Sequence, residues 1–137
     1  MKGEKGFTLI EILLVVVIIG ALAAMVVPRL AGRSEQAKIT ISRVDIDANI
    51  ASALKLYELD NGTFPTAGQG LDALLKKPAS GPIPSNWNGP YLEKEPLDPW
   101  GRKYQYQFPG THGVNYDLYS FGPNEKEDKD NINNWKS

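Results

Sequence analysis

Hydrophobic residues are distributed very unevenly along this chain of 137 residues. Between Phe7 and Val27, twenty-one residues follow one another without Lys, Arg or Asp, and fourteen of them are Phe, Leu, Ile or Val. A helix of that length measures about 30 Å, which is the thickness of the hydrocarbon core of a bilayer. The pattern predicts a membrane-spanning helix at residues 7–27, preceded by a short segment at 1–6 and followed by a polar head domain at 28–137.

One charge, Glu11, interrupts the apolar run. The fourteen large apolar residues favour insertion by about 4–8 kcal/mol in total, whereas an acidic residue at the centre of a span costs about 2.5–3.5 kcal/mol. Glu11 lies near one end, where the cost is smaller, so insertion is favoured. The leading segment carries Lys2 and Lys5 and should stay cytoplasmic, with the C-terminal side across the membrane.

The helix is expected to continue beyond the membrane span. Pro28 lacks an N–H and should kink or locally melt it, and Gly32 loosens the same region. An apolar face then recurs with helical spacing and ends at the stop signal Asn61-Gly62. Its predicted members are Ile46, Ile50, Ala53, Leu54 and Tyr57, widened by Val44, Ala48 and Ala51. We therefore expect one long helix from about residue 7 to 60.

The remainder of the head domain indicates loops followed by strands. Prolines make residues 63–99 mostly irregular apart from a short helix at 69–77, and aromatic residues should anchor this loop to the core. The anchors are Trp87, Tyr91 and Trp100. Strands are predicted at Lys103–Phe108, with Tyr104, Tyr106 and Phe108 on one face, at Val114–Phe121 and at Asn131–Trp135. The predicted fold class is α+β, a long helix packed on a small antiparallel sheet.

Composition excludes several classes of function. The chain has no Cys, so it has no disulfide framework, zinc ribbon or thiol nucleophile. Its formal charge is −1 and its basic residues are dispersed, which gives no nucleic-acid interface. His112 is the only histidine and should be solvated in a turn rather than catalytic. No catalytic motif is present, so we predict a protein that is not an enzyme.

Three interpretations of the N-terminal segment compete. It could be an ordinary membrane anchor, or a secretory signal cleaved after Ala21-Leu22-Ala23, although an early acidic residue fits a signal poorly. The third comes from resemblance: Lys5-Gly6 followed by Phe7-Thr8-Leu9-Ile10-Glu11 resembles the prepilin peptidase site of type IV pilins and type II secretion pseudopilins.

That resemblance implies a role for each motif residue. Gly6 falls at the cleavage glycine, Phe7 at the N-methylated first residue of the mature chain, and Pro28 at the family's helix-interrupting proline. Cleavage would remove residues 1–6 as a leader and free an amine on Phe7. In a stack of helices, Glu11 could then pair with the amine of a neighbouring Phe7, which would set the register between subunits.

The resemblance extends along the chain to the major, G-type pseudopilin of type II secretion. The segments that carry it are Asp60-Asn61-Gly62, Phe64-Pro65-Thr66, Gln69-Gly70-Leu71, Lys77-Pro78, Asp98-Pro99-Trp100-Gly101, Tyr119-Ser120-Phe121-Gly122 and Asn131-Ile132-Asn133-Asn134-Trp135. It implies a homopolymeric filament that drives folded proteins across the outer membrane. It also implies prepilin peptidase, minor pseudopilins and the inner-membrane platform as partners. The chain would span the inner membrane once, with its head in the periplasm.

Two other classes stay open on the sequence. One is a type IV pilus subunit, although many such pilins close a C-terminal loop with a disulfide that this chain cannot form. The other is a membrane-tethered exported binding protein or an enzyme that uses only carboxylates.

The loop at residues 122–131, GPNEKEDKDN, contains four acids and two lysines and could be a solvated turn. In the G-type family this loop wraps a structural calcium, which takes six to eight oxygen ligands. The resemblance implies as ligands the Phe121 carbonyl and the side chains of Asn124, Asp130 and Asn131, and Asp128 could supply a compensating carboxylate. Amides replace two of the expected carboxylates, so weaker calcium binding is expected.

Overall fold

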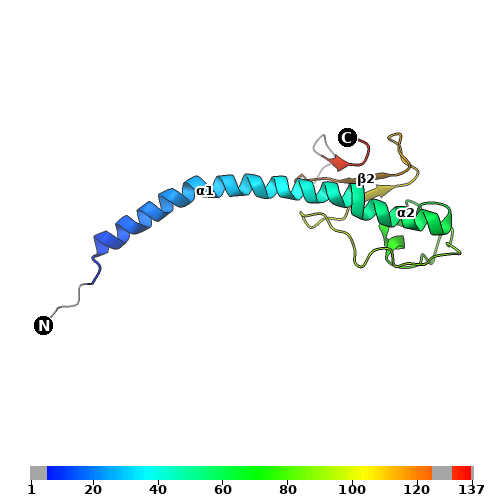
Figure 1. The fold of residues 1–137 in the computed structure, drawn as a ribbon, viewed down its shortest axis with the longest axis horizontal. Coiled ribbons are helices and arrows are strands. Elements are labelled where there is room, and N and C mark those ends of the chain that lie inside the picture. Colours follow the sequence, from blue (N-terminus) through cyan, green and yellow to red (C-terminus); the bar gives the residue numbers. More distant parts are fainter. Residues whose placement is uncertain (1–5, 125–130, 137) are drawn as a thin grey trace. The chain divides into compact units, whose positions relative to one another are not determined.

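The computed structural model describes residues 6–124 and 131–136, with the backbone alone over 27–31. Three helical elements follow one another without a gap: α1 at Leu9–Val44, the π-helix η1 at Asp45–Asn49, and α2 at Ile50–Asn61 (Figure 1). The chain divides into two compact units, residues 1–36 and 37–137. The predicted long helix is confirmed in extent, and the first part of α1 lies in one unit while its end lies in the other.

The backbone of α1 stays helical through residue 28 and through Gly32. Of the kink or local melting predicted at Pro28, the melting is therefore wrong, and the kink stays a prediction. A proline removes only one helical hydrogen bond, so the turns on either side of it can stay closed.

The π-helix η1 was not expected from the sequence. Its hydrogen bond runs from the Ile50 N–H to the Asp45 carbonyl, one residue further than in an α-helix. The Asn49 side-chain amide also donates to the Asp45 carboxylate at 2.8 Å. A single π turn accommodates one extra residue within an otherwise α-helical segment. Sequence periodicity does not reveal it, because the apolar spacing on either side remains compatible with one face.

The core of the head unit lies on one face of η1 and α2. The predicted residues Ile46, Ile50, Ala53, Leu54 and Tyr57 are all at most 2% exposed. The proposed widening of that face is wrong, because Val44 is 49% exposed and Ala48 is also exposed, while Ala51 is only half-buried. Val44 and Ala48 fit the helical spacing of the sequence, but they lie on a face of the helix that is directed away from the core.

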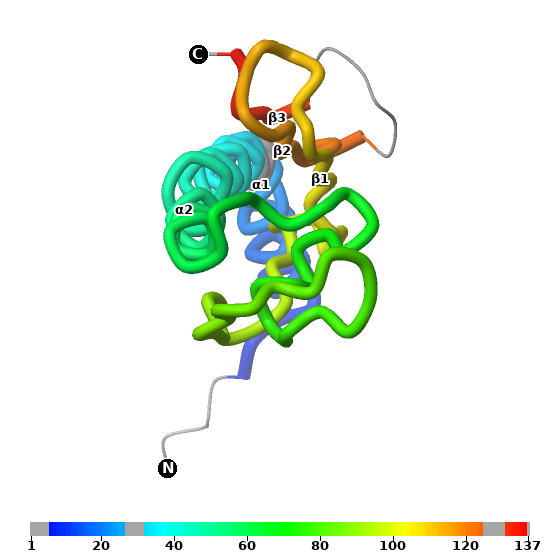
Figure 2. The backbone as a smooth tube through the Cα atoms, turned by 90° about the vertical axis from the view of Figure 1, so that its right-hand side faces the viewer, coloured from blue at the N-terminus to red at the C-terminus, as the bar shows by residue number. Residues whose placement is uncertain are grey.

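Three short antiparallel strands pack on this helix face in the order β1-β2-β3 (Figure 2). They are β1 at Gln105–Gln107, β2 at Asp117–Ser120 and β3 at Ile132–Asn133. Tyr106 lies opposite Leu118, and Ser120 lies opposite Ile132. All three predicted strands are confirmed, although each is shorter than the predicted segment. Leu118 and Ile132 point into the core, so the α+β fold class is confirmed.

The segment between helix and sheet is mostly irregular, as predicted. α2 ends at Gly62, whose φ of 79° is a left-handed conformation that favours glycine. The short helix predicted at 69–77 is only a 3₁₀ turn, η2 at Gly70–Leu74. The three predicted anchors pack against the core, and the Trp87 indole N–H donates to the Ala73 carbonyl at 2.8 Å.

Candidate functional site

The start of α1 brings two of the predicted site residues together. Glu11 sits one turn after Phe7, and its backbone N–H donates to the Thr8 hydroxyl at 3.2 Å. The Thr8 N–H reaches back to the Glu11 carboxylate at 3.5 Å. Thr8 and Glu11 therefore form a capping box, in which a side chain from each satisfies a backbone donor of the other. The T-x-x-E spacing indicates such a capping box, but our predictions for Glu11 did not include it.

The helix that follows presents its apolar side chains to the outside. Leu9–Val26 is long and apolar enough to cross a membrane by length and composition, and none of this stretch is buried. Phe7 itself is 80% exposed. A groove of about 260 Å³ lies beside the capping box, lined by Phe7, Glu11, Ile12, Val15 and Val16. Within this described N-terminal unit, the apolar surface has no internal partner, which suits lipid or a neighbouring helix.

The predicted calcium loop is held at its first residues by a polar network. Asp98, 4% exposed, accepts hydrogen bonds from the Trp100 N–H at 3.1 Å and the Arg102 N–H at 2.8 Å. Its second oxygen accepts the Ser120 hydroxyl at 2.8 Å, and that hydroxyl accepts the Gly122 N–H at 3.0 Å. The Arg102 guanidinium donates to the Gly122 carbonyl. The Asp-Pro-Trp-Gly motif thus fixes the backbone on either side of Phe121.

The other end of the loop is held by the C-terminal segment. Asn134 extends the sheet, because its side chain accepts the Leu118 N–H at 3.0 Å and donates to the Tyr116 carbonyl at 2.8 Å. Arg43 on α1 donates to the Asn133 carbonyl at 2.9 Å. The terminal asparagines therefore tie the chain end to both sheet and helix. This function could be seen only once the strands were placed.

The structure brings only part of the predicted calcium site into view. Phe121 is half-buried at the end of β2, Asn124 is exposed, and Asn131 directly precedes β3. Asp128 and Asp130 lie outside the described residues. Among the residues that are described, no group of three or more His, Cys, Asp or Glu side chains is close enough to hold a metal ion.

His112 is not simply solvated, as the sequence had suggested. Its ring nitrogen Nδ1 lies 2.8 Å from the Asp117 carboxylate, and its ring stacks on Trp135 with centroids 3.9 Å apart. The Thr111 N–H and hydroxyl also donate to Asp117, at 3.1 and 2.7 Å. Burial alone would raise the pKa of Asp117, but these donors outweigh it and lower that pKa. The histidine helps to hold the C-terminal segment, a structural role.

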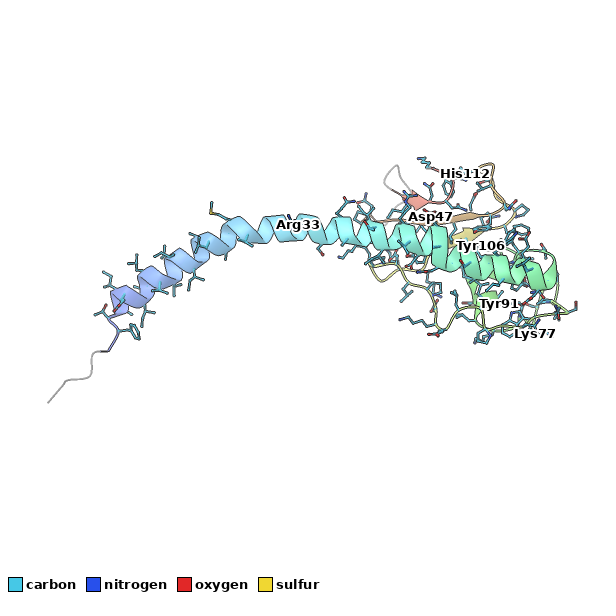
Figure 3. All side chains as sticks on the ribbon, viewed as in Figure 1. Arg33, Asp47, Lys77, Tyr91, Tyr106 and His112 are labelled. Atoms are coloured by element: carbon cyan, nitrogen blue, oxygen red, sulfur yellow. The ribbon has the colours of Figure 1, made fainter. Side chains whose placement is uncertain are left out.

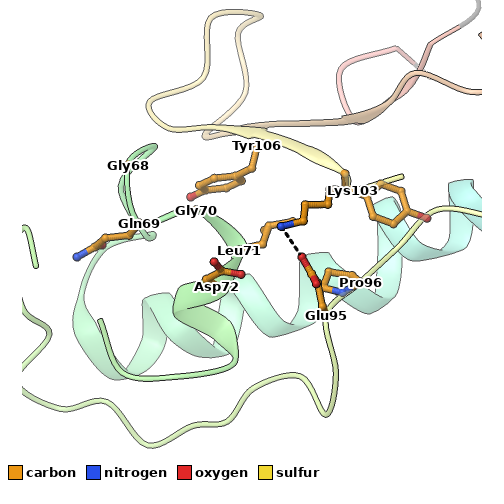
Figure 4. A pocket seen from close by; sticks show the side chains of 10 residues that line it. Gly68, Gln69, Gly70, Leu71, Asp72, Glu95, Pro96, Lys103 and Tyr106 are labelled. Atoms are coloured by element: carbon orange, nitrogen blue, oxygen red, sulfur yellow. Dashed lines mark ion pairs between the residues drawn. The ribbon is translucent and has the colours of Figure 1, made fainter. Parts of the chain in front are cut away.

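A pocket of about 260 Å³ lies beside η2 and β1 (Figure 4). Its charged groups are Asp72 and the ion pair between Glu95 and Lys103, 2.8 Å apart. The hydrogen bond that the Lys103 ammonium donates to the Glu95 carboxylate raises the pKa of Lys103, so the amine stays protonated and is a poor nucleophile. The neighbouring Gln69 amide bonds the Ser80 and Pro82 carbonyls, both at 3.0 Å, and thereby braces the loop.

Comparison with known proteins agrees with the two-part organisation. Residues 1–27 match the model of the prokaryotic N-terminal methylation motif, and residues 29–135 match the model of type II secretion system protein G. The first match defines a protein with a pilin-like N-terminus. The second covers most of the head, and the chain belongs to the type II secretion system protein G family.

Individual relatives align over almost their whole length. The type II secretion system core protein G of Pseudomonas aeruginosa is 55% identical, covering 98% of this chain and 96% of that protein. The type II secretion system core protein G of Escherichia coli K12 is 46% identical, covering 96% of this chain and 91% of that protein. The crystal structure of the major pseudopilin from enterohaemorrhagic Escherichia coli superposes with a TM-score of 0.70 at 38% identity, covering 77% of this chain and 89% of that one.

Proposed function

We propose that this protein is the structural subunit of a type II secretion pseudopilus, a short helical filament that drives folded proteins across the outer membrane. The observation that carries this proposal is the apolar surface of α1, which is exposed over Leu9–Val26 although the head has a separate buried core. Membership of the protein G family and the methylation motif support a role of this surface in filament assembly. No catalytic role is required of any residue.

Maturation is proposed to occur at Gly6-Phe7. Prepilin peptidase would remove residues 1–6, and the new amine of Phe7 would be methylated, as the matched motif suggests. Before assembly, the chain would span the inner membrane once, with its head in the periplasm. Minor pseudopilins and the inner-membrane secretion platform would be its partners. N-terminal analysis and intact mass of the membrane-purified protein test this step, and a mature start at Ala24 would contradict it.

Glu11 is proposed to have two roles, one within a single chain and one between neighbouring chains of the filament. In a single chain its carboxylate caps the first turn of α1 through Thr8. In the filament it would pair with the cationic amine of a neighbouring Phe7, because a lone carboxylate among apolar helices is costly and a paired one is tolerated. The apolar groove beside Phe7 and Glu11 is a surface on which such a neighbour would pack.

We also propose that the loop at 122–131 binds a structural calcium ion. The candidate ligands, Phe121 carbonyl, Asn124, Asp128, Asp130 and Asn131, are all oxygen donors, the class that calcium prefers. The Asp98 and Arg102 network fixes the backbone next to Phe121. Because the Arg102 cation lies at the loop entry and two ligands are neutral amides, we expect weak binding.

Thermal unfolding of the full-length protein in detergent, with calcium or with chelator, tests the metal proposal. A ligand that binds only the folded chain at a hundredfold excess over its Kd adds about 2.7 kcal/mol to the free energy of unfolding. Millimolar calcium should raise Tm, and Asp130→Ala should remove that rise. If neither calcium nor the substitution changes Tm, the metal proposal fails while the filament proposal stands.

The filament proposal is tested by electron microscopy of cells that overexpress the chain together with its secretion genes. Short sheared filaments that depend on the secretion ATPase are expected. Filaments that form only with type IV pilus components would instead favour the pilin alternative, which shares the N-terminal motif.

A further inference from the structure

We propose that Asn88 is a site of spontaneous covalent modification, at which the side-chain amide is lost and an isoaspartyl linkage forms, whereas the fold protects Asn61 from the same reaction. Of the nine asparagines in the chain, these two alone precede a glycine. Glycine has no Cβ to hinder its own backbone nitrogen, so both positions are reactive by sequence. The structure distinguishes them. This inference goes beyond the proposed filament function and does not depend on it.

The reaction needs only the chain itself and water. The backbone nitrogen of Gly89 forms a bond to the side-chain carbonyl carbon of Asn88, the amide C–N bond breaks, and ammonia leaves with the proton of the Gly89 nitrogen. Water then adds to one of the two carbonyls of the cyclic imide. Opening at one carbonyl gives aspartate, and opening at the other gives isoaspartate, whose main chain contains one extra methylene. The nitrogen and the carbon must first come within about 3–3.5 Å of each other.

Both reacting groups are available at Asn88. The side chain is exposed, so water can reach the imide. Within the described residues, neither the Asn88 amide nor the Gly89 N–H makes a hydrogen bond, and only the Asn88 backbone N–H is engaged. The side chain can therefore rotate towards the Gly89 nitrogen without losing a partner, and that nitrogen can attack without first leaving an acceptor.

The fold also explains why a glycine follows Asn88. A Cβ atom at residue 89 would lie 2.5 Å from the Trp87 ring, so any other residue would displace this ring. The indole N–H of Trp87 is held by the Ala73 carbonyl at 2.8 Å. The packing of the anchor Trp87 thus requires the neighbour that makes Asn88 reactive.

Asn61 is restrained at both of its reacting groups. It is the last residue of α2, and its side-chain amide donates to the Tyr57 carbonyl at 3.0 Å. The N–H of Gly62, the attacking nitrogen at this site, donates to the Glu58 carbonyl at 2.7 Å. Reaction requires the last turn of α2 to open so that both hydrogen bonds are lost. We therefore expect modification at Asn61 to be slower than at Asn88 by about tenfold or more.

The modification should loosen the loop that contains it. The Asn88 N–H donates to the Tyr91 hydroxyl at 3.0 Å, and this hydroxyl donates to the Asp60 carboxylate on α2 at 2.7 Å. Tyr91, beside α2 in Figure 3, also contacts the Trp87 ring edge-on, with centroids 5.7 Å apart. An extra methylene between Asn88 and Gly89 lengthens the short connection between these two aromatic anchors. Both then cannot keep their present positions on the core.

Peptide mapping of the aged protein tests the site. The full-length chain is incubated in detergent at mildly alkaline pH and sampled over weeks, and a parallel sample is kept unfolded in guanidinium chloride. Trypsin places the two asparagines in different peptides, because Lys76 and Lys77 lie between them. Mass spectrometry measures loss of the amide, and a methyltransferase specific for isoaspartate measures the rearranged linkage.

In the folded protein, Asn88 should be modified about tenfold faster than Asn61 or more, and in denaturant the two rates should become similar. Asn88→Gln is the matched control, because it keeps the amide but disfavours ring closure, and it should remove the isoaspartate of the folded protein. Equal rates in the folded chain would overturn the proposal. So would reaction of both sites in denaturant and of neither in the folded chain, or an unchanged isoaspartate content in Asn88→Gln.

Thermal unfolding tests the effect on the loop. The isoaspartyl fraction, separated from the unmodified chain by ion exchange, should have a lower Tm than unaged protein. Asn88→Asp introduces the same charge without the extra methylene and should keep the original Tm. An unchanged Tm of the isoaspartyl fraction would show that the loop accommodates the linkage. An equal fall in both samples would assign the effect to charge, and either result would contradict the loosening proposed here.

Discussion

Apolar side chains are exposed at one end of the continuous helical stretch and buried at the other. Over Leu9–Val26 every apolar side chain is exposed, whereas Ile46, Leu54 and Tyr57 are almost completely buried against the sheet. The first segment adds no packing to its own chain, because it has no second layer to contact. The second completes a core. Substitutions in the two segments should therefore fail in different assays, the first in assembly and the second in unfolding.

The largest effect is expected at Glu11. Glu11→Leu should abolish filaments, a loss of at least a hundredfold, because the amine of a neighbouring Phe7 would be buried without its partner. Membrane insertion should remain intact or improve, and cleavage after Gly6 should persist. The measurement is the amount of sheared filament set against the amount of N-terminally processed protein in the membrane.

Glu11→Gln is the control that separates the two roles of this side chain. Glutamine can still complete a capping box with Thr8, but it cannot carry a negative charge. If pairing with the amine is what matters, Gln should fail in assembly as Leu does. Normal filaments from Glu11→Gln would assign Glu11 to helix capping alone.

The next largest effect is expected in the core of the head, where neighbours two residues apart make a matched pair. Leu54→Ala should lower the free energy of unfolding by about 2–5 kcal/mol, because it opens a cavity at a fully buried site. Leu56→Ala removes a side chain that is 52% exposed and should change the free energy by less than about 0.5 kcal/mol. Denaturant unfolding of both variants checks this, and equal losses would contradict the assignment of faces on α2.

A smaller loss is expected at Asp98. Asp98→Ala leaves the Trp100 and Arg102 N–H groups and the Ser120 hydroxyl without their acceptor. Hydrogen bonds to a charged group contribute about 1.5–3 kcal/mol each in favourable cases, and partial rescue by water should keep the total near 2–3 kcal/mol. Thermal unfolding measures it. A stability equal to that of the unsubstituted chain would mean that the motif does not hold the turn.

The smallest effect is one of pH. The folded state lowers the pKa of Asp117, so this carboxylate stabilises the fold above its unfolded pKa of about 3.9. That stabilisation is lost as the pH falls through the lower, folded pKa. Stability should therefore decline on acidification below about pH 4, and Asp117→Asn should reduce that slope. An identical acid slope in the variant would mean that another carboxylate is responsible.

Much of this architecture could be predicted from local patterns. The apolar run, the helical spacing through Tyr57 and the alternation around Tyr106 each reflect a neighbour-to-neighbour periodicity, and the structure confirms each. The roles of Asp98 and His112 depend on partners 22 and 5 residues away and on the placement of β2, which no periodicity encodes. The Thr8 and Glu11 capping box is also a local feature, because the T-x-x-E spacing encodes it.

The helical spacing also predicted, wrongly, that Val44 and Ala48 belong to the buried face of the helix. A periodic pattern gives the angular position of a residue but not the width of the surface that the sheet covers. The sheet has three short strands in the described part of the chain, so it covers a narrow strip of the helix. Apolar residues just outside this strip stay exposed, and the same limit leaves Leu56 and Leu59 without an internal partner.

The π turn at Asp45–Asn49 has a consequence for how such a chain can vary in length. Because a single π turn absorbs one surplus residue, the segments before and after it keep their faces although the count of residues between them has changed. Removing Asn49 should accordingly yield an uninterrupted α-helix that still buries Ile46 and Tyr57. The helix of the head unit can thus lose one residue at this point without turning its buried face away from the core, a freedom that a strictly α-helical segment would not have.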